Sequence, residues 1–214
     1  MFVRASFFKG TGPQLDAAVA LIRDRLEPSL RTQAGFVGNV TLLDRESGQG
    51  TSATYWQTVA DMSAAEDMGV AARTEAGERA GVQIIDIDRF EHILLDRVAP
   101  PSGSGFIRTT ELRGSPDRID ALRAALDKSV SVLRSRRGYR AAVMAVNRTT
   151  GRVLLSSVWE TAANRDAPDP ELGRVREEAA RVVGSPPPRI VRSEIVLSTL
   201  NPALLESQTT AASR

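Results

Sequence analysis

The chain consists of two copies of one segment, and this internal repeat limits the fold more than any other feature. The interval between copies is 104 residues at first, and 103 residues after one single-residue gap. The matched pairs are Phe2 and Phe106, Arg4 and Arg108, Gly10 and Gly114, Asp16 and Asp120, Gly35 and Gly138, Gly48 and Gly151, Trp56 and Trp159, Arg73 and Arg176, Ala76 and Ala179, Arg89 and Arg192, and Glu91 and Glu194. So many matches in one order indicate a tandem duplication.

The boundary between the copies is a segment of proline, glycine and serine. Residues 99–105 read Ala-Pro-Pro-Ser-Gly-Ser-Gly, a composition that favours neither a helix nor a strand. We therefore predict a first unit at 1–98, a linker at 99–105 and a second unit at 106–200. The small and polar residues of 201–214 predict a flexible tail.

Each copy has the periodicity of a strand, a helix, two strands, a second helix and a last strand. In the first copy the predicted strands are 2–8, 36–43, 51–59 and 84–95. An apolar stripe from Leu15 to Leu30 predicts the first helix, with a kink or an end near Glu27 because Pro28 follows. The second helix is predicted at 61–79, with Asp61 or Ser63 as its N-cap.

The second copy repeats this order. Its clearest elements are predicted strands at 139–146, 153–159 and 189–197 and a second helix at 170–183. Gly81 and Gly184 are predicted to end the second helix of each copy, because glycine readily adopts the left-handed conformation that follows a helix.

The order of elements predicts the fold class. Two strand–helix–strand units with right-handed crossovers form a four-stranded antiparallel sheet with both helices on one face. The other face needs a cover, because large exposed apolar patches are unusual. We therefore predict an α+β protein of two ferredoxin-like βαββαβ units, whose antiparallel sheets pack together as an intrachain α+β barrel. The duplication makes the chain a pseudo-dimer, and further association of copies stays open.

Two short motifs carry a family resemblance. Gly35-Phe36-Val37-Gly38 opens the second strand, and Thr54-Tyr55-Trp56-Gln57-Thr58 ends the third. With the βαββαβ order, these motifs resemble the antibiotic biosynthesis monooxygenase group of the dimeric α+β barrel superfamily. The resemblance covers most of the first half and, more loosely, the second. Relatives usually pair two chains into the barrel, whereas here the duplication could supply both halves.

The resemblance implies three activities. Members oxidise aromatic polyketide-like compounds without metal or flavin, degrade heme, or isomerise small acids, and others have no known activity. Heme-degrading members use a His ligand and a Trp on the second helix of each unit. Residues 61–79 contain neither, and the single histidine, His92, falls on the last strand, which counts against heme chemistry. We therefore expect no cofactor and no metal.

Three classes of function stay open. The first is a small-molecule oxygenase or isomerase that acts without a bound metal, on an aromatic molecule. The second is a non-catalytic ligand-binding barrel, and the third is a structural barrel without a site. Whether the protein is an enzyme is not decided by the sequence.

Charge and composition exclude other classes. The formal net charge is +2, and arginines alternate with acidic residues along the chain, so nucleic-acid binding is not expected. The chain has no cysteine, which excludes disulfides and thiolate chemistry. No signal peptide and no membrane-spanning run is recognisable, and a cytoplasmic protein is predicted.

Charged residues recur on the first and last strands of each copy. Arg4 is predicted to lie opposite Glu91, and the second copy repeats the pair as Arg108 and Glu194. One interpretation is a polar lining that orients an acidic or phenolic ligand. The alternative is a structural ion pair between strands, and its presence in both copies favours this alternative.

The candidate residues for lining a substrate cavity are Arg4, Ser6, Asn39, Tyr55 and Glu91. The sequence does not identify a catalytic residue among them. The paired tryptophans, Trp56 and Trp159, are interpreted as packing residues, although stacking on a ligand stays open. His92 has no partner in the sequence pattern and is interpreted as an ordinary packed or surface residue, and acidic pairs such as Glu66-Asp67 as solvated.

Overall fold

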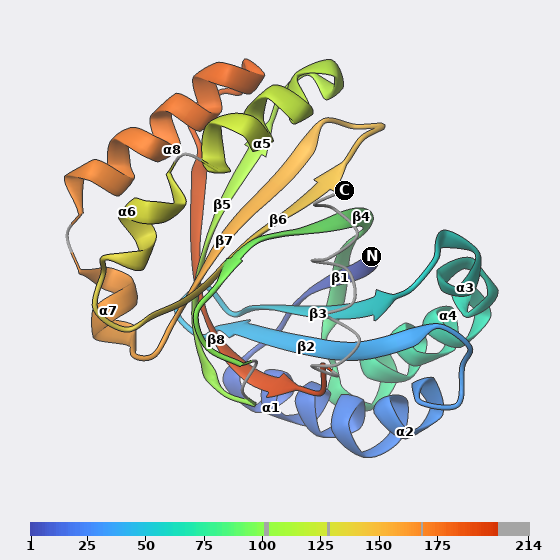
Figure 1. Cartoon of the computed structure of the whole chain (residues 1–214). Coiled ribbons are helices and arrows are strands. Elements are labelled where there is room, and N and C mark those ends of the chain that lie inside the picture. Colours follow the sequence, from blue (N-terminus) through green and yellow to red (C-terminus); the bar gives the residue numbers. More distant parts are fainter. Residues whose placement is uncertain (101–102, 128, 168, 201–214) are drawn as a thin grey trace. The chain divides into compact units, whose positions relative to one another are not determined.

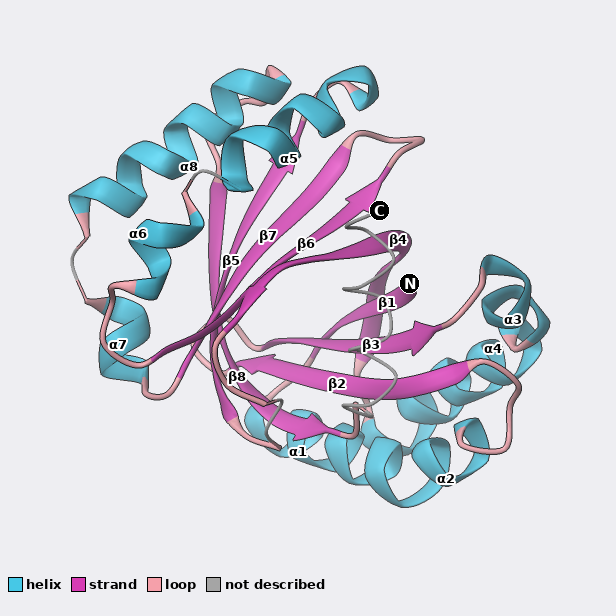
Figure 2. Ribbon diagram, in the orientation of Figure 1, coloured by secondary structure: helices cyan, strands magenta, loops and turns pink. Residues whose placement is uncertain are grey.

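The computed structural model describes residues 1–100, 103–127, 129–167 and 169–200. Over these residues both copies have the predicted order of strands and helices, and the chain is an α+β protein. The predicted tail at 201–214 lies outside the described residues. Figure 2 shows that the helices of each copy cover one face of that copy's strands.

The first copy contains four strands and two interrupted helices (Figure 1). Its elements are β1 (Phe2–Lys9), α1 (Gly12–Leu21), the π-helical turn η1 (Ile22–Leu26), α2 (Glu27–Leu30), β2 (Phe36–Asp44), β3 (Gln49–Trp56), α3 (Val59–Ala64), α4 (Glu66–Glu75), the π-helical turn η2 (Ala76–Ala80) and β4 (Gln83–Arg97).

The second copy follows the same plan. Its elements are β5 (Gly105–Arg113), the 3-10 turn η3 (Pro116–Arg118), α5 (Ile119–Asp127), α6 (Val130–Arg134), β6 (Tyr139–Asn147), β7 (Arg152–Trp159), α7 (Ala162–Asp166), α8 (Pro170–Val183) and β8 (Arg189–Ser198). The predicted helix at 170–183 and both glycine ends are confirmed, since Gly81 and Gly184 have φ of 69° and 68°.

The strands form a closed antiparallel barrel in the order β1-β3-β2-β8-β5-β7-β6-β4. The predicted intrachain α+β barrel is therefore confirmed. Two compact units can be distinguished: unit 1 consists of Met1–Arg89 with the segment that begins at Glu194, and unit 2 of Phe90–Pro100 and Gly105–Ser193. Each unit thus includes the end of the other copy's last strand. In unit 2, β4 pairs with β6, and in unit 1, β8 pairs with β2.

The helices of unit 1 differ from a regular course in two places. Of the two alternatives predicted near Glu27, the end is wrong, because the first helix continues to Leu30; it does so through an irregular π-helical turn, η1, which stops directly before Glu27. Proline has no N–H to donate, and the widened turn that precedes Pro28 accommodates this loss. The second helix begins at Val59, earlier than predicted, and is interrupted at Ala65.

The N-cap of that second helix is Thr58, so the prediction of Asp61 or Ser63 is wrong. The Thr58 hydroxyl accepts a hydrogen bond from the Asp61 backbone N–H at 3.0 Å. In unit 2, Thr161 caps α7 in the same way through Asn164, at 3.1 Å. The apolar pattern of the sequence places Thr58 in the third strand, which was predicted to end at residue 59. The strand ends three residues earlier, at Trp56, so Thr58 is free to cap the helix.

Candidate functional site

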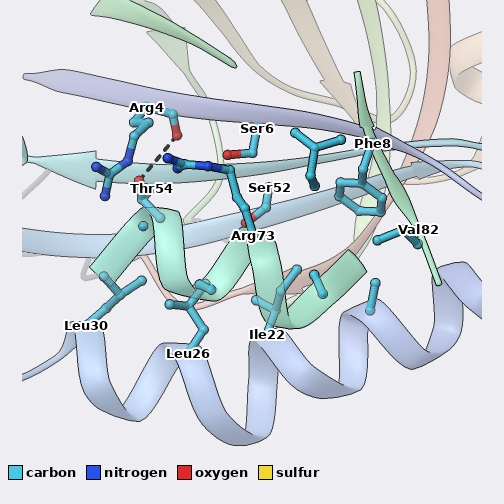
Figure 3. Close-up of a pocket in the computed structure, with 15 residues that line it drawn as sticks. Arg4, Ser6, Phe8, Ile22, Leu26, Leu30, Ser52, Thr54, Arg73 and Val82 are labelled. Carbon is cyan, nitrogen blue, oxygen red and sulfur yellow. Dashed lines mark hydrogen bonds between the residues drawn. The ribbon is translucent and has the colours of Figure 1, made fainter. Parts of the chain in front are cut away.

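Unit 1 contains a partly open cavity between its strands and its helices (Figure 3). Its volume is about 60 Å³. A water molecule needs roughly 10–15 Å³ of such space, so the cavity admits several waters or part of a small flat molecule. The lining residues are Arg4, Ser6, Phe8, Ala18, Ile22, Leu26, Leu30, Ser52, Thr54, Gly69, Ala72, Arg73, Ala76, Val82 and Ile84.

Small side chains on the helices make room for this cavity. Gly69, Ala72 and Ala18 line it. In the repeat, the residues equivalent to these are Leu172, Val175 and Leu122 of unit 2. Leu122 and Val175 pack in the core of unit 2, so the larger side chains occupy the space that unit 1 leaves open.

Most of the cavity wall is apolar. Ile22, Leu26 and Leu30 point from the first helix toward the strands, and Phe8 faces them from β1 (Figure 3). Two of these helical residues, Ile22 and Leu26, belong to the π-helical turn η1, whose wider backbone changes the direction of the side chains that follow it. An apolar ligand surface of modest size therefore fits this wall.

The polar end of the cavity is built around Arg4. Its side chain is 3% exposed, and its guanidinium donates to the backbone carbonyls of Met62 at 3.4 Å and Ala65 at 3.2 Å. The guanidinium also lies 5.7 Å from the ring centre of Trp56, a cation–π distance. Burial lowers the pKa of Arg4, and the hydrogen bond to Glu66 works against this effect. Arg4 is therefore a fixed cation at the wall of the cavity.

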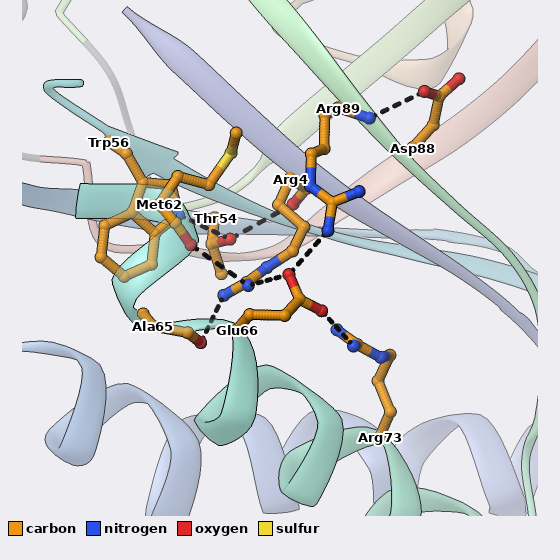
Figure 4. A network of polar contacts seen from close by, with 9 residues as sticks. All are labelled: Arg4, Thr54, Trp56, Met62, Ala65, Glu66, Arg73, Asp88 and Arg89. Carbon is orange, nitrogen blue, oxygen red and sulfur yellow. Dashed lines mark hydrogen bonds and ion pairs between the residues drawn. The ribbon is translucent and has the colours of Figure 1, made fainter. Parts of the chain in front are cut away.

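Glu66 neutralises part of this positive charge (Figure 4). Its carboxylate accepts hydrogen bonds from Arg4 at 2.9 Å, Arg73 at 2.8 Å and Arg89 at 2.8 Å. Burial alone would raise the pKa of Glu66, but these three arginines outweigh it and hold the pKa at about 2. Because three cations share one carboxylate, the polar end keeps a positive excess.

Gly69 allows the two arginines to approach the helix closely. A Cβ at this position would lie 2.9 Å from Arg4 Cζ and 3.0 Å from Arg73 Nη1. Any side chain here would displace a guanidinium from its present position. Gly69 is therefore required for the geometry of the arginine cluster as well as for the space beside it.

The structure places two of the five predicted cavity residues, Arg4 and Ser6, at the cavity. Asn39 is fully buried behind the lining, where its amide donates to the Ser52 hydroxyl at 3.0 Å and accepts from Thr41 at 2.8 Å. It fixes Ser52, which does line the cavity. Tyr55 is not among the lining residues and pairs with Val3 through the adjacent strand.

The predicted pairing of Arg4 with Glu91 is wrong. Arg4 contacts Glu66 on α4, whereas Glu91 lies in the part of β4 that belongs to unit 2, opposite Val146, and accepts from Arg148 at 2.7 Å. The reason is the length of β4, which has 15 residues and extends beyond its own copy.

The second predicted pair fails in the same way, because Glu194 accepts from Arg45 in unit 1 and not from Arg108. The last strand of the second copy, β8, also passes from one unit to the other, and Glu194 is the first of its residues in unit 1.

The tryptophans have the predicted packing role. Trp56 is 0% exposed, donates to Thr54 at 3.0 Å and meets Phe36 edge to face. Trp159 repeats these contacts with Ser157 and Tyr139. His92 is not part of the cavity, and burial lowers its pKa to about 3, so that its imidazole is neutral at physiological pH.

Sequence reasoning missed Glu66 and Arg73. Glu66 was interpreted as a solvated residue, which is wrong, since its carboxylate binds three arginines. The repeat contained a usable signal, because Arg4, Arg73 and Arg89 all recur in the second copy. Three repeated arginines indicate a cationic cluster in each copy, but the sequence does not say which carboxylate, if any, binds it.

The chemistry available in the cavity follows from these groups. Two arginines can stabilise a developing negative charge on oxygen. Among the described lining residues the remaining polar groups are hydroxyls, and no carboxylate or imidazole is in position to act as a general base. Suitable ligands are therefore those that ionise readily by themselves. No helix in the described part of the chain has the length and apolar character needed to cross a membrane.

Solved structures share this fold with little sequence identity. An anthrone oxidase-like protein superposes with a TM-score of 0.65 at 16% identity, over 93% of this chain and 92% of its own. A candidate monooxygenase from Fusobacterium nucleatum gives a TM-score of 0.63 at 8% identity, over 94% of each chain. A ferredoxin-fold protein from Listeria monocytogenes, related to antibiotic biosynthesis monooxygenases, gives 0.52 at 12%, over 91% and 94%. The chain thus has the α+β barrel fold of antibiotic biosynthesis monooxygenase-like proteins.

Sequence relatives occur in Mycobacterium tuberculosis. Uncharacterized protein Rv2558 is 28% identical over 193 residues, which cover 86% of this chain and 80% of the relative. Uncharacterized protein Rv2557 is 23% identical over 162 residues, covering 75% and 72%. No protein-family model matches the chain. The fold class is therefore defined more sharply than the activity.

Proposed function

We propose that unit 1 binds a small aromatic phenol or enol in its cavity and promotes the oxidation or isomerisation of that compound without a cofactor. The observation that carries the proposal is an apolar cavity with a cationic end, formed by Arg4 and Arg73. An aromatic ring suits the apolar wall, and an ionised oxygen suits the arginines.

The proposed chemistry depends on charge stabilisation. A phenolate or enolate is the electron-rich form that reacts with oxygen or takes up a proton at carbon. Arg4 and Arg73 favour this form by binding its negative oxygen in a partly dry environment. The likeness in fold to an anthrone oxidase-like protein supports the choice of substrate class.

The volume of the cavity restricts the ligand. About 60 Å³ accommodates part of a small flat molecule, such as one edge of an aromatic ring, with the remainder at the opening. Compounds whose hydroxyl ionises near neutral pH are favoured, because the lining offers no base to remove the proton. Acidic phenols and the enol forms of 1,3-diketones meet both conditions.

The proposal is tested by filling the cavity with the side chains that unit 2 has at these places. The variant Ala18→Leu with Ala72→Val should abolish the increase in melting temperature that an acidic nitrophenol causes in the wild-type protein. Its matched control is Ala17→Leu with Ala71→Val, which changes exposed neighbours on the same two helices. The control should keep the full response to the ligand.

Two measurements separate binding from catalysis. Oxygen consumption and the absorbance of the phenol or diketone report turnover, and the melting temperature reports binding. Binding that survives in the filled variant would refute the site. Binding without turnover of any acidic phenol or diketone would leave a non-catalytic binding protein and refute the catalytic part.

A further inference from the structure

The arginine cluster of unit 1 has a counterpart in unit 2. Arg108, Arg176 and Arg192 are the repeat equivalents of Arg4, Arg73 and Arg89. In unit 1 this trio surrounds the Glu66 carboxylate. The same three cations are therefore present in unit 2. The question is which carboxylate of unit 2, if any, binds them.

The equivalent acidic residue of unit 2 is engaged elsewhere. By the interval of the repeat, Asp169 stands where unit 1 has Glu66. Its side chain is one methylene shorter, and it accepts from Arg136 at 2.6 Å. It also caps α8 by accepting from the Leu172 backbone N–H at 3.0 Å. Asp169 is thus a helix cap bound to a different arginine.

Arg108 is left without the carboxylate that its counterpart Arg4 has. The residue is 7% exposed, and its buried Nε has no hydrogen-bond partner. Over the described ranges no carboxylate lies in ion-pairing distance of Arg108, whereas Arg192 contacts Asp166 at 3.3 Å. Burial lowers the pKa of Arg108, the charges of Arg176 and Arg192 lower it further, and the charge of Asp166 works against this effect without closing an ion pair. A buried cation of this kind is costly unless an anion joins it.

Arg108 faces an open cleft in unit 2. The cleft has a volume of about 500 Å³, within the range of small-molecule sites. Ala167 and Pro170 supply exposed apolar surface among the lining residues, which also include the buried Trp159 and Leu172, and Asn164 adds a polar group. The two acidic residues of the cleft, Asp169 and Glu171, both bind Arg136, which leaves Arg108 as a buried cation without an ion pair among the described lining residues.

We propose that unit 2 contains a second binding site, in which Arg108 binds the carboxylate of a small apolar acid. The bound carboxylate takes the part that Glu66 plays in unit 1, and the apolar portion of the acid lies against the apolar lining of the cleft, where Ala167 and Pro170 are exposed. A carboxylate is favoured over a tetrahedral oxyanion because the homologous trio binds a planar carboxylate in unit 1. This site is separate from the cavity of unit 1 and does not depend on the activity proposed for it.

The test uses benzoate as the probe and calorimetry as the readout, with the full chain at low ionic strength. Wild-type protein should bind benzoate and not benzamide, its neutral counterpart. Arg108→Met should weaken benzoate binding roughly tenfold or more, the loss of one charge-assisted hydrogen-bond pair. Arg123→Met, which removes an arginine from the surface of α5, should leave the affinity unchanged.

The melting temperatures of the arginine variants without benzoate give a second, independent test of whether Arg108 lacks an anionic partner in the fold. Without benzoate, Arg108→Met should melt at or above the wild-type temperature, because it removes an unpaired buried charge. Arg4→Met should melt lower, because Arg4 has its carboxylate and two carbonyl partners. Arg108→Lys should bind benzoate with intermediate affinity, since it keeps the charge without the planar fork.

Several outcomes would overturn the proposal. Equal affinity for benzoate and benzamide, or equal affinity in wild type and Arg108→Met, would show that Arg108 binds no carboxylate. Binding of inorganic phosphate without binding of benzoate would overturn the choice of a carboxylate. A melting temperature of Arg108→Met well below that of Arg4→Met would show that Arg108 is already neutralised within the fold.

Discussion

Units 1 and 2 are built from two copies of one segment. They differ most in the space between their strands and helices and in the partners of their buried arginines. Unit 1 has small residues on its helices and an arginine trio bound to Glu66. Unit 2 has larger residues there, which pack in its core, and an arginine trio whose acidic counterpart serves as a helix cap. A few differences in side-chain size and length thus give two similar units different interior space and different arginine partners.

Side-chain size at a few helical positions accounts for this contrast. Unit 1 has a cavity where it carries alanine and glycine and unit 2 carries leucine and valine. The buried arginine of unit 2 lacks an ion pair where unit 2 carries aspartate and unit 1 carries glutamate. Neither difference disturbs the strands, so the barrel is retained while the helical sides diverge. Three experiments test this contrast between the units.

The largest effect is expected from Glu66→Gln. This change leaves Arg4, Arg73 and Arg89 without their carboxylate, and Arg4 is buried, so unfolding should become easier by about 3–4 kcal/mol. The matched change in unit 2, Asp169→Asn, keeps a good helix cap and should cost only about 1 kcal/mol. Urea denaturation of both variants measures the difference. Equal losses would mean that the two acidic residues have equivalent roles.

A smaller effect is expected from opening unit 2 in the manner of unit 1. Leu122→Ala places the unit 1 residue in the core of unit 2 and should cost about 3 kcal/mol, from lost burial and the cavity that remains. The variant should also gain a binding site for small apolar molecules. An increase in the melting temperature of the variant on addition of xenon or benzene would show this binding. A variant that neither loses stability nor binds such molecules would show that this position does not control the space.

The smallest and most gradual effect is expected from pH. The folded pKa of Glu66 is about 2, below the value of an ordinary glutamate, so the folded state holds this carboxylate in its charged form. Its contribution is fully present above the unfolded pKa and is lost as the pH falls toward 2. Melting temperatures between pH 5 and pH 2.5 should decline more steeply in wild type than in Glu66→Gln. Parallel curves would refute the role assigned to Glu66.

Prediction from the sequence succeeded where a feature depends on local chemistry or on the repeat. The predicted end of α8 at Gly184 and its start at Pro170 are confirmed, because proline and glycine act on the backbone next to them. The tryptophan pair was correctly interpreted as packing, since equal placement in both copies is typical of a structural role. Two of the candidate site residues, Arg4 and Ser6, line the cavity, and their part in binding a substrate stays a prediction.

Prediction failed where two distant segments decide the outcome together. The partner of Arg4 was expected on the neighbouring last strand, but β4 continues into unit 2 and carries Glu91 with it. The partner is Glu66, which lies on a helix. Glu66 had been interpreted as a solvated residue, because it is one of a pair of adjacent acidic residues. Asp169 could be aligned with Glu66, yet its hydrogen bonds to Arg136 and to the start of α8 could not be inferred from that alignment.

The duplication, the order of the elements and the α+β class could be read from the residues alone, because they follow from periodicity and from turn residues that act locally. The pairing of each arginine with its carboxylate, and the space left in the interior, became known from the folded structure. Those outcomes depend on distances of a few ångströms between side chains that are far apart in the chain. A change of one methylene, or of one small residue for a larger one, is enough to alter them.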